Sequence, residues 1–171
     1  MTQTASAATA NPVATANSVQ YLTFVCADEA YGVDILRVQE IKGWDHVTRV
    51  PYVAPYILGV MNLRGVIVPV IDLRARFTLA KRARDASTVV IVVRVHSSRG
   101  DKTVGIVVDG VSDVCSFTAD AIKPTPDFAG SVNNGCISGI AKVDGKLVML
   151  LDIDSLGRGC VETAASAHLN A

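Results

Sequence analysis

Aromatic residues, net charge and long apolar runs are all scarce in this chain of 171 residues. It has one Trp, four Tyr and four Phe, and its 16 basic residues are balanced by 16 acidic ones. Single-stranded nucleic acid binds to basic grooves in which exposed aromatic side chains stack on the bases. A chain without net charge attracts neither nucleic acid nor an anionic membrane as a whole. Its apolar runs, such as 89–93, fall far below the roughly 18 residues of a membrane-spanning helix. We therefore expect a soluble protein that does not bind nucleic acid.

Sequence motifs of catalysis and metal binding are also missing. The chain contains no GxxxxGK[ST], GxGxxG, HExxH or GxSxG. The cysteines have no CxxC spacing and the histidines lie far apart, so we expect inert or buried thiols and surface rings (Cys26, Cys115, Cys136, Cys160; His46, His96, His168). Asp152 and Asp154 resemble a fragment of a metal motif, but the repeat described below favours a helix cap. We predict a protein without enzymatic activity, metal or cofactor.

The composition places one folded region between two tails. Half of the residues are apolar, which excludes a largely disordered chain. Residues 1–18 are almost entirely Ala, Thr, Asn and Ser, without the basic start and apolar segment of a secretory signal. Residues 159–171 are mostly small and polar. The sequence predicts a cytosolic protein with a folded part at 19–158 and flexible tails at 1–18 and 159–171.

A segment of the chain occurs twice. Residues 59–73 align without a gap on residues 139–153, and both copies consist of two apolar strands joined by a polar-Gly turn. Arg64-Gly65 and Asp144-Gly145 form these turns, a position where Gly and Asp tolerate positive φ. Each copy ends in an Asp suited to cap a helical turn, over 73–77 or 153–156. The repeat predicts two β-hairpins, each followed by a short helical turn.

A second correspondence extends the repeat toward the N-terminus. Residues 32–41 align on residues 105–114, and a β-rich run precedes each copy. Residues 35–41 also fit one face of a helix, but the matching segment contains Gly110 and several Val residues, which favour a turn and a strand. Each copy, at 19–79 and 86–158, therefore holds about five strands. We predict an all-β protein of two five-stranded barrels that share apolar surface, with function at the groove between them.

Two opposite charges stand in otherwise apolar strands. Glu40 lies within Val38–Ile41, and Arg64 lies in the predicted hairpin turn Asn62-Leu63-Arg64-Gly65. One interpretation is two unconnected surface charges or an exposed ion pair, worth about 0–1 kcal/mol. The other is a pair at the edge of an apolar groove that shapes the site for a partner. The basic connector 74–84 is predicted to be a solvated loop, or a contact for an acidic protein surface.

Three long motifs resemble the CheW family of bacterial chemotaxis coupling proteins. They lie in the family's order, within residues 19–158, and comprise residues 31–41, 49–74 and 104–114. The resemblance implies two five-stranded SH3-like β-barrels. It also implies a non-enzymatic adaptor that links the cytoplasmic tips of methyl-accepting chemoreceptors to the regulatory domain of the histidine kinase CheA, in the cytoplasm and recruited to membrane receptor arrays.

The resemblance also implies where the partners bind. The receptor tip would lie in the groove between the barrels, on a set of residues carried over by motif: Ile35, Val38, Glu40, Arg64 and Val114. The kinase would dock at a barrel end whose residues stay unassigned. Without the resemblance, three classes remain open: a paired-barrel protein scaffold, a barrel that binds single-stranded nucleic acid, and a hydrolase with an unrecognised site.

Overall fold

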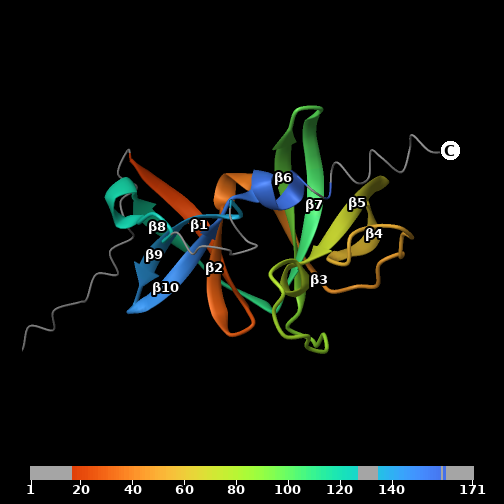
Figure 1. Ribbon diagram of the computed structural model, residues 1–171, viewed down its shortest axis with the longest axis horizontal. Helices are drawn as coiled ribbons and strands as arrows, with labels where there is room; N and C mark the ends of the chain where they lie inside the picture. The colour runs from red at the N-terminus through yellow and green to blue at the C-terminus, as the bar shows by residue number, and fades with distance from the viewer. Residues whose placement is uncertain (1–16, 127–134, 159, 161–171) are drawn as a thin grey trace, which may run out of the picture.

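The computed structural model describes residues 17–126, 135–158 and 160, and these residues form two five-stranded sheets (Figure 1). The strands are β1 Ser18–Cys26, β2 Glu29–Asp34, β3 Val38–Gly43, β4 Ile57–Leu63, β5 Val66–Asp72, β6 Val89–Ser97, β7 Gly100–Val108, β8 Gly110–Thr118, β9 Ile137–Val143 and β10 Lys146–Leu151. Short helical turns are η1 Ile35–Arg37, α1 Leu73–Arg76 and η2 Ala119–Ala121. The predicted all-β class, with two five-stranded units and short helical turns, is confirmed.

Each sheet takes strands from both copies of the repeat. Sheet A has the order β8-β1-β2-β10-β9, and sheet B has the order β3-β6-β7-β5-β4. The prediction that residues 19–79 and 86–158 each build their own barrel is therefore wrong. The chain leaves sheet A through the three residues of η1 and returns from sheet B through Asp109 alone. At each of these short connections the chain passes from one sheet into the other. The β1–β2 hairpin of the first copy therefore joins β8, β9 and β10 of the second copy, and the β6–β7 hairpin of the second copy joins β3, β4 and β5 of the first. In this sense the two hairpins are exchanged between the copies.

The exchange keeps the two sheets equivalent at the level of single residues. In sheet A, Leu150 pairs with Gly32 across parallel strands, and in sheet B, Val70 pairs with Gly105. A Cβ atom on Gly32 would lie 2.9 Å from Leu150 Cδ2, and one on Gly105 would lie 2.9 Å from Val90 Cγ1. Each sheet thus has a glycine on a strand at the junction between the copies, with an apolar side chain packed close to it: Leu150 of the other copy at Gly32, and Val90 of the same copy at Gly105.

A short backbone pairing covers one edge of each sheet. Thr48 pairs with Val60 of β4, and Lys123 pairs with Ile140 of β9. The residue before each paired strand position is a glycine, at 59 and 139. A Cβ on Gly59 would lie 2.1 Å from the carbonyl oxygen of Thr48, so this close approach excludes any side chain. These pairings satisfy backbone groups that an open sheet edge would expose.

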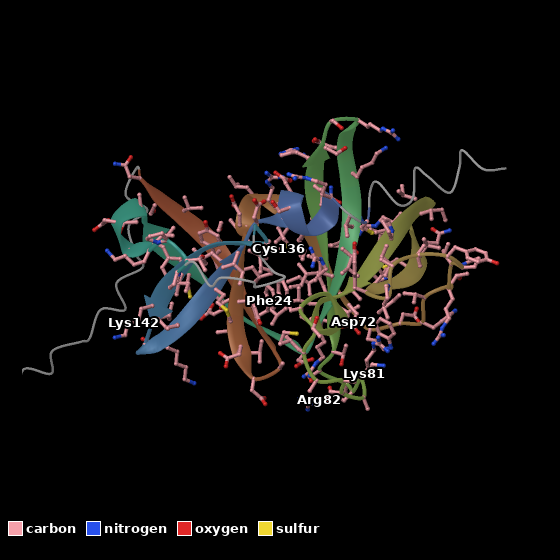
Figure 2. All side chains as sticks on the ribbon, viewed as in Figure 1. Phe24, Asp72, Lys81, Arg82, Cys136 and Lys142 are labelled. Carbon is pink, nitrogen blue, oxygen red and sulfur yellow. The ribbon has the colours of Figure 1, made fainter. Side chains whose placement is uncertain are left out.

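The apolar residues form three cores, and the largest lies between the sheets. The apolar run 89–93 in β6 is continuous because both faces of this strand are buried. Ile91 and Val93 face sheet A, whereas Val90 and Val92 pack inside sheet B. Phe24 of β1 is 1% exposed and lies at the centre of the molecule (Figure 2). A third cluster lies within sheet A, around Leu150. The predicted sharing of apolar surface between the two units is confirmed.

An acidic residue caps the helical turn that follows each hairpin, as the repeat predicts. Asp72 accepts a hydrogen bond from the Arg74 backbone N–H at 3.0 Å and begins α1. Asp152 accepts from the backbone N–H groups of Asp154 and Ser155 at 3.1 and 3.2 Å. Residues 153–158 and Cys160 are helical, and Cys160 is 1% exposed. The C-terminal tail predicted from residue 159 therefore includes one residue that belongs to the core. The other residues of the two predicted tails lie outside the described ones, apart from 17 and 18.

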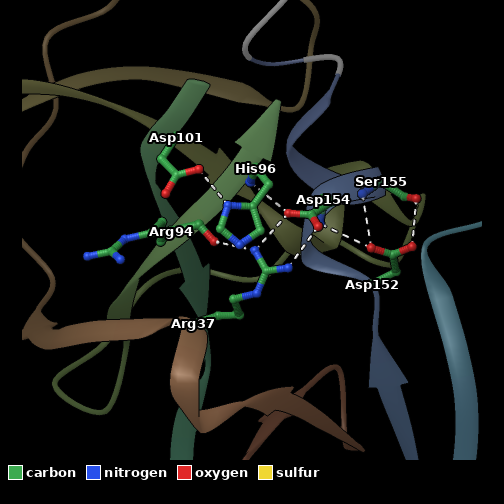
Figure 3. A network of polar contacts seen from close by, with 7 residues as sticks. All are labelled: Arg37, Arg94, His96, Asp101, Asp152, Asp154 and Ser155. Atoms are coloured by element: carbon green, nitrogen blue, oxygen red, sulfur yellow. Dashed lines mark hydrogen bonds and ion pairs between the residues drawn. The ribbon is translucent and has the colours of Figure 1, made fainter. Parts of the chain in front are cut away.

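Two Arg–Asp ion pairs join the sheets. The crossing segment carries the arginine in one pair and the aspartate in the other. Arg37 of η1 holds Asp154 through two hydrogen bonds of 2.9 and 2.8 Å, and Asp154 also accepts from the His96 backbone N–H at 2.7 Å (Figure 3). At the equivalent place, Arg74 of α1 makes a bidentate contact with Asp109. Arg74 and Asp154 are equivalent in the repeat, whereas Asp109 lies one residue before Gly110, the equivalent of Arg37.

Hydrogen bonding keeps the carboxyl groups of both pairs charged. Burial acts to raise the pKa of Asp154, but hydrogen bonds from Arg37 and from the His96 backbone, together with the Arg37 charge, lower it overall. Asp109 behaves alike: burial opposes the hydrogen bonds from Arg74 and Ala27, and its pKa is lowered. A carboxyl group whose pKa is lowered by folding stabilises the protein above its unfolded pKa, about 3.9, and this contribution is lost as the pH falls through the folded value.

We predict that Gly59→Ala severely destabilises the protein. The added Cβ would overlap the Thr48 carbonyl, and Gly59 has φ of +148°, so the free energy of unfolding should fall by roughly 3 kcal/mol or more. Chemical denaturation measures this change. Gly43→Ala is the matched control, because nothing lies within 4 Å of its Cβ position, and it should stay within about 0.5 kcal/mol of the parent. Equal stability of the two variants would show that the edge pairing is dispensable.

A second prediction concerns acid stability. Asp154→Asn should lower the free energy of unfolding by roughly 1–3 kcal/mol at pH 7, since Arg37 loses its charged partner. The difference from the parent should shrink as the pH falls below about 4, because protonation removes the same charge from the parent. Urea denaturation across this pH range measures it. Asp144→Asn, in an exposed hairpin turn, is the control and should change little at any pH. A difference at Asp154 that does not vary with pH would contradict the assignment.

Candidate protein-binding site

Glu40 and Arg64 form the ion pair that the sequence suggested. Arg64 Nη2 lies 2.9 Å from Glu40 Oε2, which joins β3 to the turn between β4 and β5. β3 and β4 lie at opposite edges of sheet B in strand order, so only the curvature of the sheet brings the two residues together. The Glu40 side chain is 21% exposed and that of Arg64 is 80% exposed. The pairing is confirmed, whereas its role in binding stays a prediction.

The turn that carries Arg64 holds the backbone in an unusual conformation for arginine. Arg64 has φ of +52° and Gly65 has φ of +86°, and the Gly65 N–H donates to Asn62 Oδ1 at 2.8 Å. Positive φ is common for Gly, Asn and Asp but uncommon for other residues. In the matching turn the position belongs to Asp144, with φ of +48°. The arginine is therefore not explained by turn geometry, and the contact that the structure shows for its side chain is the ion pair with Glu40.

The predicted apolar residues lie on both sides of the junction between the sheets. Ile35 of η1 and Val38 of β3 are half-buried and pack against the core between the sheets. Val114 is 45% exposed on β8, where it pairs with Leu22 of β1. The structure thus brings Ile35, Val38, Glu40 and Arg64 to η1 and sheet B, while Val114 belongs to the edge strand of sheet A. β1 contacts both η1 and β8, and so connects the two parts.

Leu36 is a candidate contact that the sequence patterns did not single out. Asp34 Oδ1 accepts a hydrogen bond from the Leu36 backbone N–H at 2.9 Å and so caps η1. This turn directs Ile35 toward the core and leaves Leu36 85% exposed. The sequence signal for this exposed residue was an apolar side chain two positions after Asp34, which caps the turn. A capped turn of this kind leaves one of its first residues exposed.

The cysteine thiols are suited to packing and not to nucleophilic chemistry. Burial raises the pKa of Cys26 to about 12, with a further contribution from the Asp109 charge, and burial raises that of Cys160 to about 11. Reactive thiols need a lowered pKa. Cys26, Cys136 and Cys160 are buried, and Cys115 is half-buried. The prediction of small buried groups is confirmed for the first three.

No metal-binding cluster of three His, Cys, Asp or Glu occurs among residues 17–126, 135–158 and 160. The two aspartates that resemble a metal motif are used otherwise: Asp152 caps a helix and Asp154 binds Arg37. No helix in the described part of the chain combines the length and the apolar character needed to cross a membrane.

The basic connector is exposed and outside helices and strands at 80–84, as predicted, but it begins in α1 and several of its charges are paired. Arg74 is bound to Asp109 with its side chain 12% exposed, and Arg84 lies 3.3 Å from Asp72. Arg82 reaches Asp85 at 3.4 Å. Several of its charges are therefore neutralised by nearby carboxylates, and only part of the segment is available to a partner.

Comparisons with known proteins agree with the geometry. The family model described as "CheW-like domain" matches residues 20–159. The Chemotaxis protein CheW of Klebsiella aerogenes is 45% identical over 153 residues, which cover 87% of this chain and 90% of that protein. The corresponding protein of Bacillus subtilis is 33% identical over 135 residues, or 79% of this chain and 84% of that protein.

A solved structure has the same fold. The crystal structure of the scaffolding protein TtCheW from Thermoanaerobacter tengcongensis superposes with a TM-score of 0.73 and 32% identity, covering 81% of this chain and 91% of that one. The family model spans both sheets and includes the Glu40–Arg64 pair and both exchanged hairpins. From the fold, the repeat and these matches together, the chain belongs to the CheW-like domain family.

Proposed function

We propose that this protein is a non-enzymatic chemotaxis adaptor that couples methyl-accepting chemoreceptors to the histidine kinase CheA. The Glu40–Arg64 ion pair carries the proposal: an arginine in an unfavourable backbone conformation reaches across sheet B to a partly buried carboxylate. Membership of a family whose curated relatives are named for chemotaxis supports it. So does the scaffolding role printed for the protein with the similar structure.

The receptor tip would bind along the junction between the two sheets. Ile35, Val38 and Val114 supply apolar contacts there, with Leu36 as an added exposed one. The Glu40–Arg64 pair lies at the sheet B end of this surface and fixes the position of the Arg64 guanidinium. A receptor segment that covers the pair would remove it from water, where a charge left without its partner costs more than on an open surface.

The regulatory domain of CheA would bind a second surface, at a barrel end to which we assign no residues. The shared core and the two ion pairs, Arg37–Asp154 and Arg74–Asp109, hold the sheets as one body. A rigid body with two binding surfaces keeps the receptor and the kinase in fixed relative geometry. A small receptor movement can then bias the kinase between active and inactive arrangements.

The adaptor would act in the cytoplasm and reach the membrane only through receptors. Its charges sum to zero, so lipid attraction gives it no way to concentrate at an anionic membrane by itself. Recruitment to receptor arrays then depends on the binding surface at the sheet junction.

Charge reversal tests the receptor surface. Glu40→Arg and Arg64→Glu should each weaken binding to a receptor-tip fragment by about tenfold or more, because each places two like charges side by side. The double variant should bind better than either single one, since it restores an ion pair of opposite polarity. Surface plasmon resonance with the immobilised tip measures the affinities.

The control reverses Arg82 and Asp85, an exposed pair with a distance of 3.4 Å on the connector. It should leave receptor affinity within about twofold of the parent. If the double reversal at 40 and 64 binds no better than the single changes, the pair does not act as a unit. If none of the variants weakens binding, the receptor surface lies elsewhere.

Assembly tests the coupling itself. The purified protein should co-sediment with receptor-tip fragments and CheA as a ternary complex, and each binary contact should be detectable alone. A variant that loses receptor binding through Glu40→Arg should keep its contact with CheA, because the two surfaces are separate. Failure of both binary contacts would remove the coupling proposal, even though the family assignment would stand.

A further inference from the structure

The β6–β7 hairpin is longer than the β1–β2 hairpin that matches it in the repeat. Counted from the equivalent glycines 32 and 105, its ladder of paired residues runs two pairs further. β3 pairs with β6 only as far as Val93, and β5 pairs with β7 only from Gly105 onward. Residues 94–103, which we call the arm, therefore project beyond both neighbouring strands of sheet B, as the green hairpin in Figure 1 shows.

Side chains from two other segments hold the outer edge of the arm. Beyond the end of β3, Arg37 Nη1 donates a hydrogen bond to the Arg94 carbonyl oxygen at 3.2 Å, and the His96 backbone N–H donates to Asp154 Oδ1 at 2.7 Å (Figure 3). Arg37 and Asp154 also bind each other. The ion pair thus takes the place of a neighbouring strand along this part of β6, and it fixes the backbone at the base of the arm.

The arm stands beside two of the candidate receptor contacts. Thr103 Oγ1 donates a hydrogen bond to Gln39 Oε1 at 3.2 Å. The arm therefore contacts both residues that flank Val38, namely Arg37 and Gln39. Leu36, which is 85% exposed, comes directly before Arg37. A partner segment that covers Leu36 and Val38 would therefore lie next to the arm.

One residue of the arm lies on the same face of sheet B as the Glu40–Arg64 ion pair. Val92 of β6 pairs with Glu40 of β3. Arg94 follows Val92 by two positions, and residues two apart on a strand share a face. Figure 3 shows the Arg94 guanidinium directed away from the polar network at the base of the arm. Arg94 thus extends the charged surface that begins at Glu40 and Arg64.

The arm carries an excess of positive charge. Arg94, Arg99 and Lys102 are exposed, and none of them forms an ion pair with any residue that the structure describes. The one acidic residue of the arm, Asp101, already has a partner, because its Oδ1 lies 2.5 Å from His96 Nδ1. In a chain whose charges sum to zero, this local excess of positive charge attracts carboxylates.

We propose that the arm binds acidic side chains of the receptor segment that lies on Leu36 and Val38. This contact rests on the proposed receptor function and adds to the residues assigned to it. An arginine matches a carboxylate with two parallel hydrogen bonds. A hairpin that is fixed at its base presents its charges with little further loss of backbone freedom on binding.

Other anionic partners fit the arm less well. Its one apolar side chain, Val95, is 1% exposed, and residues 94–103 include no Phe, Tyr or Trp. Single-stranded nucleic acid needs aromatic side chains that stack on its bases. Stable anchoring to a membrane needs inserted apolar side chains or a lipid chain besides basic residues. The composition of the arm therefore favours carboxylates on a protein surface.

Charge reversal in the full-length protein tests the arm. Arg94→Glu with Arg99→Glu should weaken binding to a receptor-tip fragment by about tenfold or more at about 50 mM NaCl, and the difference should fall below about threefold at about 500 mM. The matched control is Lys142→Glu with Lys146→Glu, two exposed bases on the β9–β10 hairpin, and it should change the affinity less than about twofold. Equal weakening by the two double variants would reduce the effect to net charge and overturn the inference.

Glu40→Arg, measured in parallel, separates the arm from the proposed function. If Glu40→Arg weakens receptor binding and the arm variant does not, the arm is not a receptor contact, although the receptor surface stands. If neither variant changes the affinity, both proposals fall. An arm variant that keeps its receptor affinity but loses CheA would assign the arm to the kinase surface and overturn the inference.

Amide NMR shifts of the unaltered protein provide a reading that does not depend on how the variants fold. Shifts induced by the receptor-tip fragment should include residues 94–103 together with residues 35–40. Shifts at 35–40 without any in the arm would overturn the inference and leave the proposed receptor surface in place.

Discussion

The exchange of hairpins between the two sheets is the constraint on which the rest of the structure depends. β1 and β2 complete a sheet with β8, β9 and β10, while β6 and β7 complete the other with β3, β4 and β5. A unit of about 65 residues buries too little surface to be very stable alone. Because each sheet contains strands of both copies, neither copy completes a five-stranded sheet without the other. The largest core then forms between the sheets, around Phe24, Ile91 and Val93.

The shared core and two ion pairs connect the sheets around both crossings. The crossings η1 and Asp109 each carry or adjoin an ion pair, Arg37–Asp154 and Arg74–Asp109, with opposite polarity. η1 begins at Ile35, one of the predicted receptor contacts, so the same three residues hold the sheets together and lead into β3 and Glu40.

Much of the local structure was predictable because its signals are local. An Asp before an apolar turn predicts a cap, and Asp72 and Asp152 both cap helical turns. A polar residue before Gly between two apolar strands predicts a tight hairpin, and residues 64–65 and 144–145 all have positive φ. The stacking of Arg84 over the Trp44 ring was not predicted, because the two residues belong to segments that meet only when the connector folds back.

The sequence by itself determined the strands, the turns, the repeat and the family, since these depend on neighbouring residues and on the order of motifs. Only the tertiary structure decided whether the first hairpin of each copy joins the strands of its own copy or those of the other copy. The strand pattern is the same for both pairings, and the choice rests on how far a three-residue crossing can carry the chain. The tertiary structure likewise brought Glu40 within 2.9 Å of Arg64, because curvature of sheet B joins strands that lie at opposite edges in its order.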